Sequence, residues 1–89
     1  ILRDHAGRVW ITVTTRLEPW TRSINERTPD GYVALLDARG IRIVADGFLG
    51  TNEVRVDATG QWLYVVESNA RRISRLRIGR DGALSGREV

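Results

Sequence analysis

The sequence predicts an all-β protein with two four-stranded antiparallel sheets, and three observations support this prediction. Short segments rich in β-branched and aromatic residues follow one another along the 89-residue chain, as is typical of strands. Turn-forming Gly, Asp and Pro residues separate these segments, because glycine tolerates positive φ and Asp makes local side-chain turns. A D-x-x-G turn followed by a strand occurs twice, and such self-similarity indicates a repeated unit.

The strands, in chain order, are expected at residues 9–14, 32–37, 41–45, 53–57, 62–67 and 72–78. Two of them, 32–36 and 62–66, are apolar on both faces, as expected for strands between neighbouring sheets. Residues 53–57 alternate instead, with valines on one face and charged groups on the other. No segment predicts a helix. The aromatic residues of the strands are expected in the core, namely Trp10, Trp62 and Tyr64.

The internal repeat lays Asp4 over Asp57 and Trp10 over Leu63. After each copy come another strand, a turn and a further strand, so each copy amounts to a blade of up to four strands, the unit that β-propellers repeat radially. The chain is then a single partial β-propeller domain of residues 1–89, with blade one at 1–49 and blade two at 50–89. The copies differ mainly by residues 15–30, which we expect to form an ordered loop on the binding face.

Composition places the chain among folded globular proteins, with 42% hydrophobic and 28% charged residues. It contains no run of about 18 apolar residues and no signal-peptide pattern, so no membrane partner is expected and a cytoplasmic location is favoured. Cysteine is absent, which excludes disulfides and thiolate metal ligands.

The net charge of +3 comes from 14 arginines, with no lysine, spread over most of the chain. A nucleic-acid partner is not expected, because such proteins gather their cations on one face. The densest arginine set, in residues 71–80, is interpreted as the solvated outer edge of a sheet; a phosphate-binding patch is the alternative.

Two motifs resemble a known family. Residues 43–48 read I-V-A-D-G-F, and residues 51–67 carry an Asn, a D-x-x-G turn and an L-Y-V strand. Their order and spacing resemble the middle of the SMP-30/gluconolactonase/LRE-like (lactonase) β-propeller family. This resemblance implies a six-bladed propeller with a divalent metal, often calcium, in the central channel and hydrolysis of lactones or related esters. One family metal ligand, the Asn before an inner strand, corresponds to Asn52; the others fall outside this stretch, so no catalytic residue is identified.

The candidate site residues follow from that resemblance. An amide oxygen is a hard neutral ligand suited to Ca²⁺, although Asn52 is also a residue type common in turns. Glu53 departs from the commoner Gly of the family and either adds a carboxylate near the channel mouth or points into a blade interface. Arg16 and Glu18 fall where the family places a loop over the substrate, and they are candidates for substrate contact.

Two functions are compatible with these features. The first is a metal-dependent hydrolase of lactones or esters, present here as a fragment or subunit with an incomplete site. The alternative is a non-catalytic propeller module that self-associates through exposed blade edges, because unpaired edges and apolar faces bind partners. Whether the chain is an enzyme by itself is left open. The single histidine, His5, is expected in a surface turn.

Overall fold

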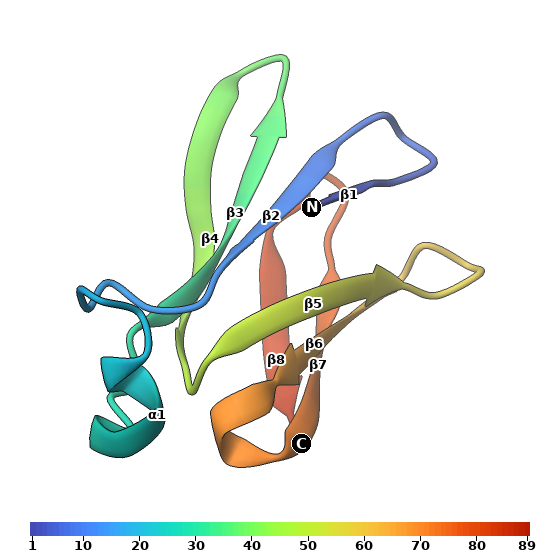
Figure 1. The fold of residues 1–89 in the computed structure, drawn as a ribbon. Helices are drawn as coiled ribbons and strands as arrows, with labels where there is room; N and C mark the ends of the chain where they lie inside the picture. Colours follow the sequence, from blue (N-terminus) through green and yellow to red (C-terminus); the bar gives the residue numbers. More distant parts are fainter.

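The computed structural model describes residues 1–89 and contains two four-stranded antiparallel sheets, as predicted (Figure 1). The first sheet has the strand order β1 (Leu2–Arg3), β2 (Val9–Val13), β3 (Gly31–Asp37) and β4 (Gly40–Phe48). The second has the order β5 (Thr51–Val56), β6 (Trp62–Glu67), β7 (Arg72–Ile78) and β8 (Leu84–Glu88). Each strand pairs with its neighbour in sequence, so both sheets are meanders.

Two short helices lie outside the sheets: α1 (Arg22–Glu26) and the 3₁₀ helix η1 (Ser68–Ala70). The expectation that no helix forms is therefore wrong for α1, which lies in the inserted segment. Five residues are too few to show a helical periodicity in sequence, and α1 is held locally by a hydrogen bond from the Arg22 backbone N–H to the Pro19 carbonyl (3.0 Å). Neither helix has the length and apolar character needed to cross a membrane.

The arginine-rich strand β7 is not an edge strand. It pairs with β6 on one side and with β8 on the other, so its interpretation as the outer edge of a sheet is wrong. The edge is β8, a mixed strand whose central Gly86 obscures its pattern. Arg75 and Arg77 instead lie over the ring of Trp62, with guanidinium carbons 4.0 and 4.2 Å from the ring centroid.

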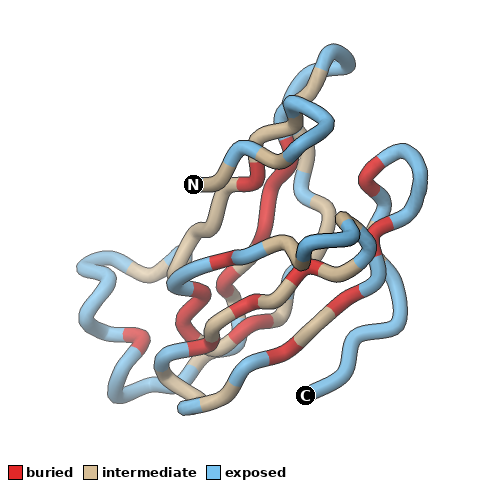
Figure 2. The backbone as a smooth tube through the Cα atoms, turned by 90° about the vertical axis from the view of Figure 1, so that its right-hand side faces the viewer, coloured by how far each residue is buried: buried red, intermediate tan, exposed pale blue.

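The core lies between the two sheets, where buried residues of β2, β3 and β4 pack against those of β5, β6 and β7, and the buried stretches of the chain lie mainly in its interior (Figure 2). Nine buried hydrophobic residues form one cluster: Trp10, Val33, Leu35, Phe48, Val54, Leu63, Val65, Leu76 and Ile78. Burying each large side chain contributes about 1.5–3 kcal/mol. Trp10 is thus a core residue as predicted. Trp62 and Tyr64 are half-buried on the opposite face of β6, so the prediction that they fill this core is wrong.

The two D-x-x-G turns form as predicted. The Gly7 backbone N–H donates to the Asp4 carbonyl, and Gly60 donates in the same way to Asp57, both at 3.0 Å. Each aspartate also accepts backbone N–H groups of its own turn through its carboxylate. The Asp side chains therefore have a structural role in these turns.

The second turn is one residue longer than the first. Arg3 pairs with Val9 across the first turn, whereas Val56 pairs with Leu63 across the second. Val9 therefore corresponds to Leu63, and Trp10 to Tyr64. The sequence repeat, which laid Trp10 over Leu63, is displaced by one residue after the turn, and a displacement of one residue exchanges the two faces of a strand.

With this correction the two sheets stack in the same sense. Trp10 faces the second sheet and is fully buried, whereas its equivalent, Tyr64, faces away from the first sheet. Conversely, Leu63 is buried in the core, whereas its equivalent, Val9, lies on the far side of the first sheet. Equivalent faces of the two sheets thus point in the same direction. The Trp10 face of the first sheet packs on the Leu63 face of the second sheet, and the Leu63 face is the equivalent of the Val9 face. We call this arrangement head-to-tail stacking.

Candidate functional site

Asn52 lies on a β-bulge at the start of β5. Thr51 pairs with Glu67 and Glu53 pairs with Val66, so Asn52 is the additional residue between these two pairs. A bulge re-aims a side chain out of the regular alternation and is common next to functional sites. The hydroxyl of Thr12 donates to the Asn52 carbonyl (3.1 Å), which ties the bulge to the first sheet.

The Asn52 side chain lines a cavity of about 450 Å³. The walls come from the end of β2, the inserted segment with α1, the turn before β5 and the connection between β6 and β7. The other lining residues are Thr14, Trp20, Ile24, Gly50, Ser68 and Asn69. The side chains of Trp20 and Ile24 form an exposed apolar rim, at 60% and 52% exposure. No lining residue carries a charge.

Amide and hydroxyl groups organise the polar wall of this cavity. Asn52 Nδ2 donates to Ser68 Oγ at 2.9 Å, which leaves Asn52 Oδ1 without a hydrogen bond from the chain. Asn69 Nδ2 donates to Ser23 Oγ at 3.1 Å, and Arg27 Nη1 donates to the Asn69 carbonyl at 2.8 Å. These two bonds connect η1 to α1, so segments more than 40 residues apart in sequence share one wall.

Gly50 allows η1 to approach the start of β5. Its φ is +70°, and a Cβ at this position would lie 2.6 Å from Asn69 Cγ. The Gly50 and Leu49 carbonyls accept the backbone N–H groups of Ser68 (2.9 Å) and Asn69 (3.1 Å). A glycine is required here because a side chain would displace Asn69 from the cavity wall.

Glu67 fixes the turn that precedes β5, which carries Gly50 of the cavity wall. Its side chain is fully buried and accepts hydrogen bonds from Arg72, from Ser74 and from the Leu49 backbone N–H. Burial by itself raises the pKa of Glu67, but these hydrogen bonds outweigh it and lower the pKa to about 2. The carboxylate is therefore charged at neutral pH and holds the turn before β5 against β7.

Glu67 was not identified from the sequence. The available signal was a glutamate at the end of the otherwise apolar strand 62–67, at a position that shares a face with Leu63 and Val65. A charged residue on a core face requires a partner, and Arg72 is the residue directly across the strand pair.

The donor set of the cavity does not fit a complete calcium site. The side-chain oxygens present are neutral, and the chain brings together no group of three or more His, Asp or Glu residues that could hold a metal ion. Calcium affinity depends on the number of charged ligands. The role of Asn52 as one metal ligand therefore stays a prediction.

The other predicted site residues lie away from this cavity. Glu53 is on the outer face of β5, about half exposed and paired with Arg55. The Arg16 guanidinium carbon lies 4.8 Å from the centroid of the Tyr32 ring, and the residue borders a separate cavity of about 210 Å³. Glu18 is exposed, and its carbonyl accepts a hydrogen bond from Arg22. The structure brings none of these three side chains to Asn52.

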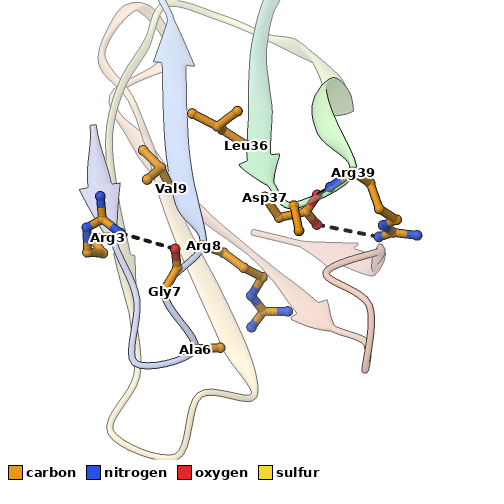
Figure 3. A pocket seen from close by; sticks show the side chains of 9 residues that line it. Arg3, Ala6, Gly7, Arg8, Val9, Leu36, Asp37 and Arg39 are labelled. Atoms are coloured by element: carbon orange, nitrogen blue, oxygen red, sulfur yellow. Dashed lines mark hydrogen bonds and ion pairs between the residues drawn. The ribbon is translucent and has the colours of Figure 1, made fainter.

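A second cavity, of about 510 Å³, lies at the opposite end of the sheets, between the β1–β2 and β3–β4 turns (Figure 3). Its cationic side chains, Arg3, Arg8 and Arg39, already have partners in the chain. Arg8 Nε is 2.8 Å from an Asp4 oxygen, Arg39 Nη2 is 3.5 Å from an Asp37 oxygen, and Arg3 donates to the Gly7 carbonyl. These contacts stabilise the turns, and the Asp4 and Asp37 carboxylates are engaged in ion pairs with the arginines.

No model of a known protein family matches the chain, and no curated protein matches it either. The fold and the cavity at Asn52 therefore carry what is proposed below about function.

Proposed function

We propose that the chain is a two-blade segment of a six-bladed β-propeller of the SMP-30/gluconolactonase type and part of a metal-dependent hydrolase of lactones or related esters. Head-to-tail stacking supports the propeller, because radially repeated blades all present the same face in the same direction. In this proposal the chain supplies Asn52 and one wall of the substrate pocket.

One observation carries the proposal. Asn52 stands on a bulge at the start of a strand, with its Oδ1 free of internal hydrogen bonds, in a cavity rimmed by Trp20. Such a combination of one apolar rim and a few oriented polar groups is typical of small-molecule sites. An uncharged wall also suits a neutral lactone or ester.

Asn52 is proposed as one neutral oxygen ligand among several. The acidic ligands must come from outside these 89 residues, since the cavity contains none. For the chain alone we expect only weak calcium binding, because the available ligands are few and neutral, and lactone hydrolysis close to the uncatalysed rate.

Two-dimensional ¹H–¹⁵N NMR of the 89-residue chain tests the proposal. Titration with Ca²⁺ should shift the side-chain amide signal of Asn52, and subsequent addition of a γ- or δ-lactone should shift the indole signal of Trp20. In Asn52→Ala both responses should disappear. In Asn52→Asp calcium binding should tighten, because the added charge strengthens a hard-cation site.

The matched control is Asn25→Ala, which removes an exposed amide that does not line the cavity and should leave both titrations unchanged. Calcium shifts that persist in Asn52→Ala, or lactone shifts at residues outside the cavity, would contradict the proposed role.

A second candidate function is a non-catalytic module that self-associates. The observation in its favour is an exposed apolar surface on the first sheet, which includes Ile41 and Ile43. Absence of any calcium or lactone response, together with association in solution, would favour this candidate.

A further inference from the structure

We propose that the outer face of the first sheet binds the outer face of the second sheet of another copy of this chain. The first of these faces consists of Val9, Ile11, Val13, Tyr32, Ala34, Leu36, Ile41 and Ile43. The second is centred on Trp62, Tyr64, Val66, Ile73, Arg75 and Arg77. The proposal deepens the self-association candidate and depends on head-to-tail stacking, not on hydrolysis.

The strand register defines the outer face of the first sheet. Ala34 pairs with Ile11 on one side and with Ile43 on the other, and Leu36 pairs with Val9 and with Ile41. Partners across a pair point to the same face, so this surface is continuous across β2, β3 and β4. The side chains that the register places on these three strands are apolar or aromatic, and the charged Arg3 of β1, which pairs with Val9, borders the surface.

This apolar surface is open to solvent. Leu36, Ile41 and Ile43 are 41%, 64% and 52% exposed, and the surface forms a shallow groove of about 360 Å³. Arg42 borders the groove, but its guanidinium turns to the Asp37 carboxylate and to the Asp81 carbonyl. Contiguous exposed apolar surface of this kind marks an interaction site.

The structure itself indicates what kind of surface covers this face. Val9 and Ile11 correspond to Leu63 and Val65, which are fully buried against the first sheet of the same chain. Ala34 and Leu36 correspond in the same way to Ser74 and Leu76, which are also buried. The outer face of the first sheet is therefore equivalent to a surface that already packs on a sheet.

The packing inside the chain also identifies the surface that should cover the outer face of the first sheet. Inside the chain, Leu63 and Val65 pack on the face that carries Trp10 and Leu35. The equivalents of Trp10 and Leu35 in the second sheet are Tyr64 and Arg75. These two residues lie on the outer face of the second sheet, which is not covered within the chain.

The outer face of the second sheet is suited to an apolar partner in spite of its arginines. Arg75 and Arg77 lie over the Trp62 ring, and Arg75 also pairs with Glu88 at the sheet edge. Arginine stems cover apolar surface while the charged ends stay hydrated, and Ile73 is 56% exposed on this face. Symmetric contact between two first-sheet faces would leave the outer face of the second sheet uncovered in both copies. Head-to-tail contact instead covers one face of each kind at every contact.

Three substitutions separate these arrangements, each at an isoleucine that is more than half exposed and can carry a lysine without disturbing the fold. Ile43→Lys blocks the first face, Ile73→Lys blocks the second, and Ile24→Lys on α1 is the control. The measurement is molar mass by light scattering over a concentration series in EDTA, so that a failed calcium site cannot affect the result.

The wild-type chain and Ile24→Lys should gain mass with concentration and pass beyond the dimer. Ile43→Lys and Ile73→Lys should each raise the dissociation constant by about tenfold or more, which corresponds to about 1.4 kcal/mol or more. An equimolar mixture of these two variants should form a one-to-one dimer with wild-type affinity and stop there, because each variant retains the face that the other needs.

Two results would overturn the proposal. A wild-type chain that stays monomeric at every concentration would show that a second copy does not cover this face. Self-association of Ile73→Lys at wild-type strength would show that the first face binds another first face, and the mixture would then give no specific one-to-one dimer.

Discussion

Replacement of Glu67 by Gln should strongly destabilise the chain. The carboxylate is fully buried, and Arg72, Ser74 and the Leu49 backbone N–H donate to it. An amide has almost the same shape, but it cannot neutralise Arg72, and its NH₂ group must face one of these donors. A buried group that loses its partner costs more than a missing surface contact.

The structure sets the magnitude. The pKa of Glu67 falls from its ordinary 4.5 to about 2, and each pKa unit corresponds to about 1.4 kcal/mol, so the charged form gains about 3 kcal/mol on folding. Small domains have total stabilities of about 5–15 kcal/mol. We therefore expect Glu67→Gln to lose about 3 kcal/mol of unfolding free energy, a large part of the total.

Urea unfolding followed by tryptophan fluorescence measures this loss. The matched control is Glu53→Gln, the same chemical change on β5 at an exposed residue paired with Arg55, where a loss below about 1 kcal/mol is expected. Equal losses in the two variants would refute the reasoning, since burial and pairing would then contribute nothing at Glu67.

The pH dependence supplies an independent check on the same residue. Because folding lowers the pKa of Glu67, its contribution is fully present above its ordinary pKa of 4.5 and is lost as pH falls towards about 2. The stability difference between the wild-type chain and Glu67→Gln should therefore shrink between about pH 5 and pH 2. A difference that stays constant over this range would mean that the carboxylate charge is not the cause.

Two further substitutions test the packing. Gly31→Ala should cost about 1–3 kcal/mol by overpacking, because the new Cβ would lie 2.2 Å from Thr51 Oγ1; an unchanged urea midpoint would contradict this close approach. Trp10→Phe should cost about 1.5–3 kcal/mol, since it keeps an aromatic ring but removes the 2.8 Å hydrogen bond from the indole Nε1–H to Asp4. Near-ultraviolet circular dichroism and urea unfolding measure this loss, and a midpoint equal to wild type would show that this bond is dispensable.

Local pattern was sufficient for most strands of the fold. The bounds predicted for 62–67 and 72–78 coincide with β6 and β7, because runs of β-branched and aromatic residues between turn residues depend on local sequence. The two-residue strand β1 escaped prediction, and β8 was expected only as a further strand without bounds, because neighbouring strands define both. The five-residue helix α1 is likewise too short to leave a pattern.

The candidate site was less accessible from sequence. Asn52 was selected by resemblance, but its position on a bulge depends on the pairing of β5 with β6. Trp20 and Asn69 reach the same cavity because α1 and η1 are joined by hydrogen bonds across distant segments. The one-residue difference between the two turns also hid which residues of the repeat share a face, since the motif alone does not reveal turn length.

The head-to-tail stacking of the sheets has a consequence for how any assembly would end. A contact between unlike faces leaves one free face of each kind however many copies have joined, so nothing in the contact itself limits growth. Growth stops if the rotation from copy to copy closes a ring, and otherwise it continues as an open filament. The angle between adjacent sheets, and not the strength of the contact, then decides whether this chain forms discrete particles or fibres.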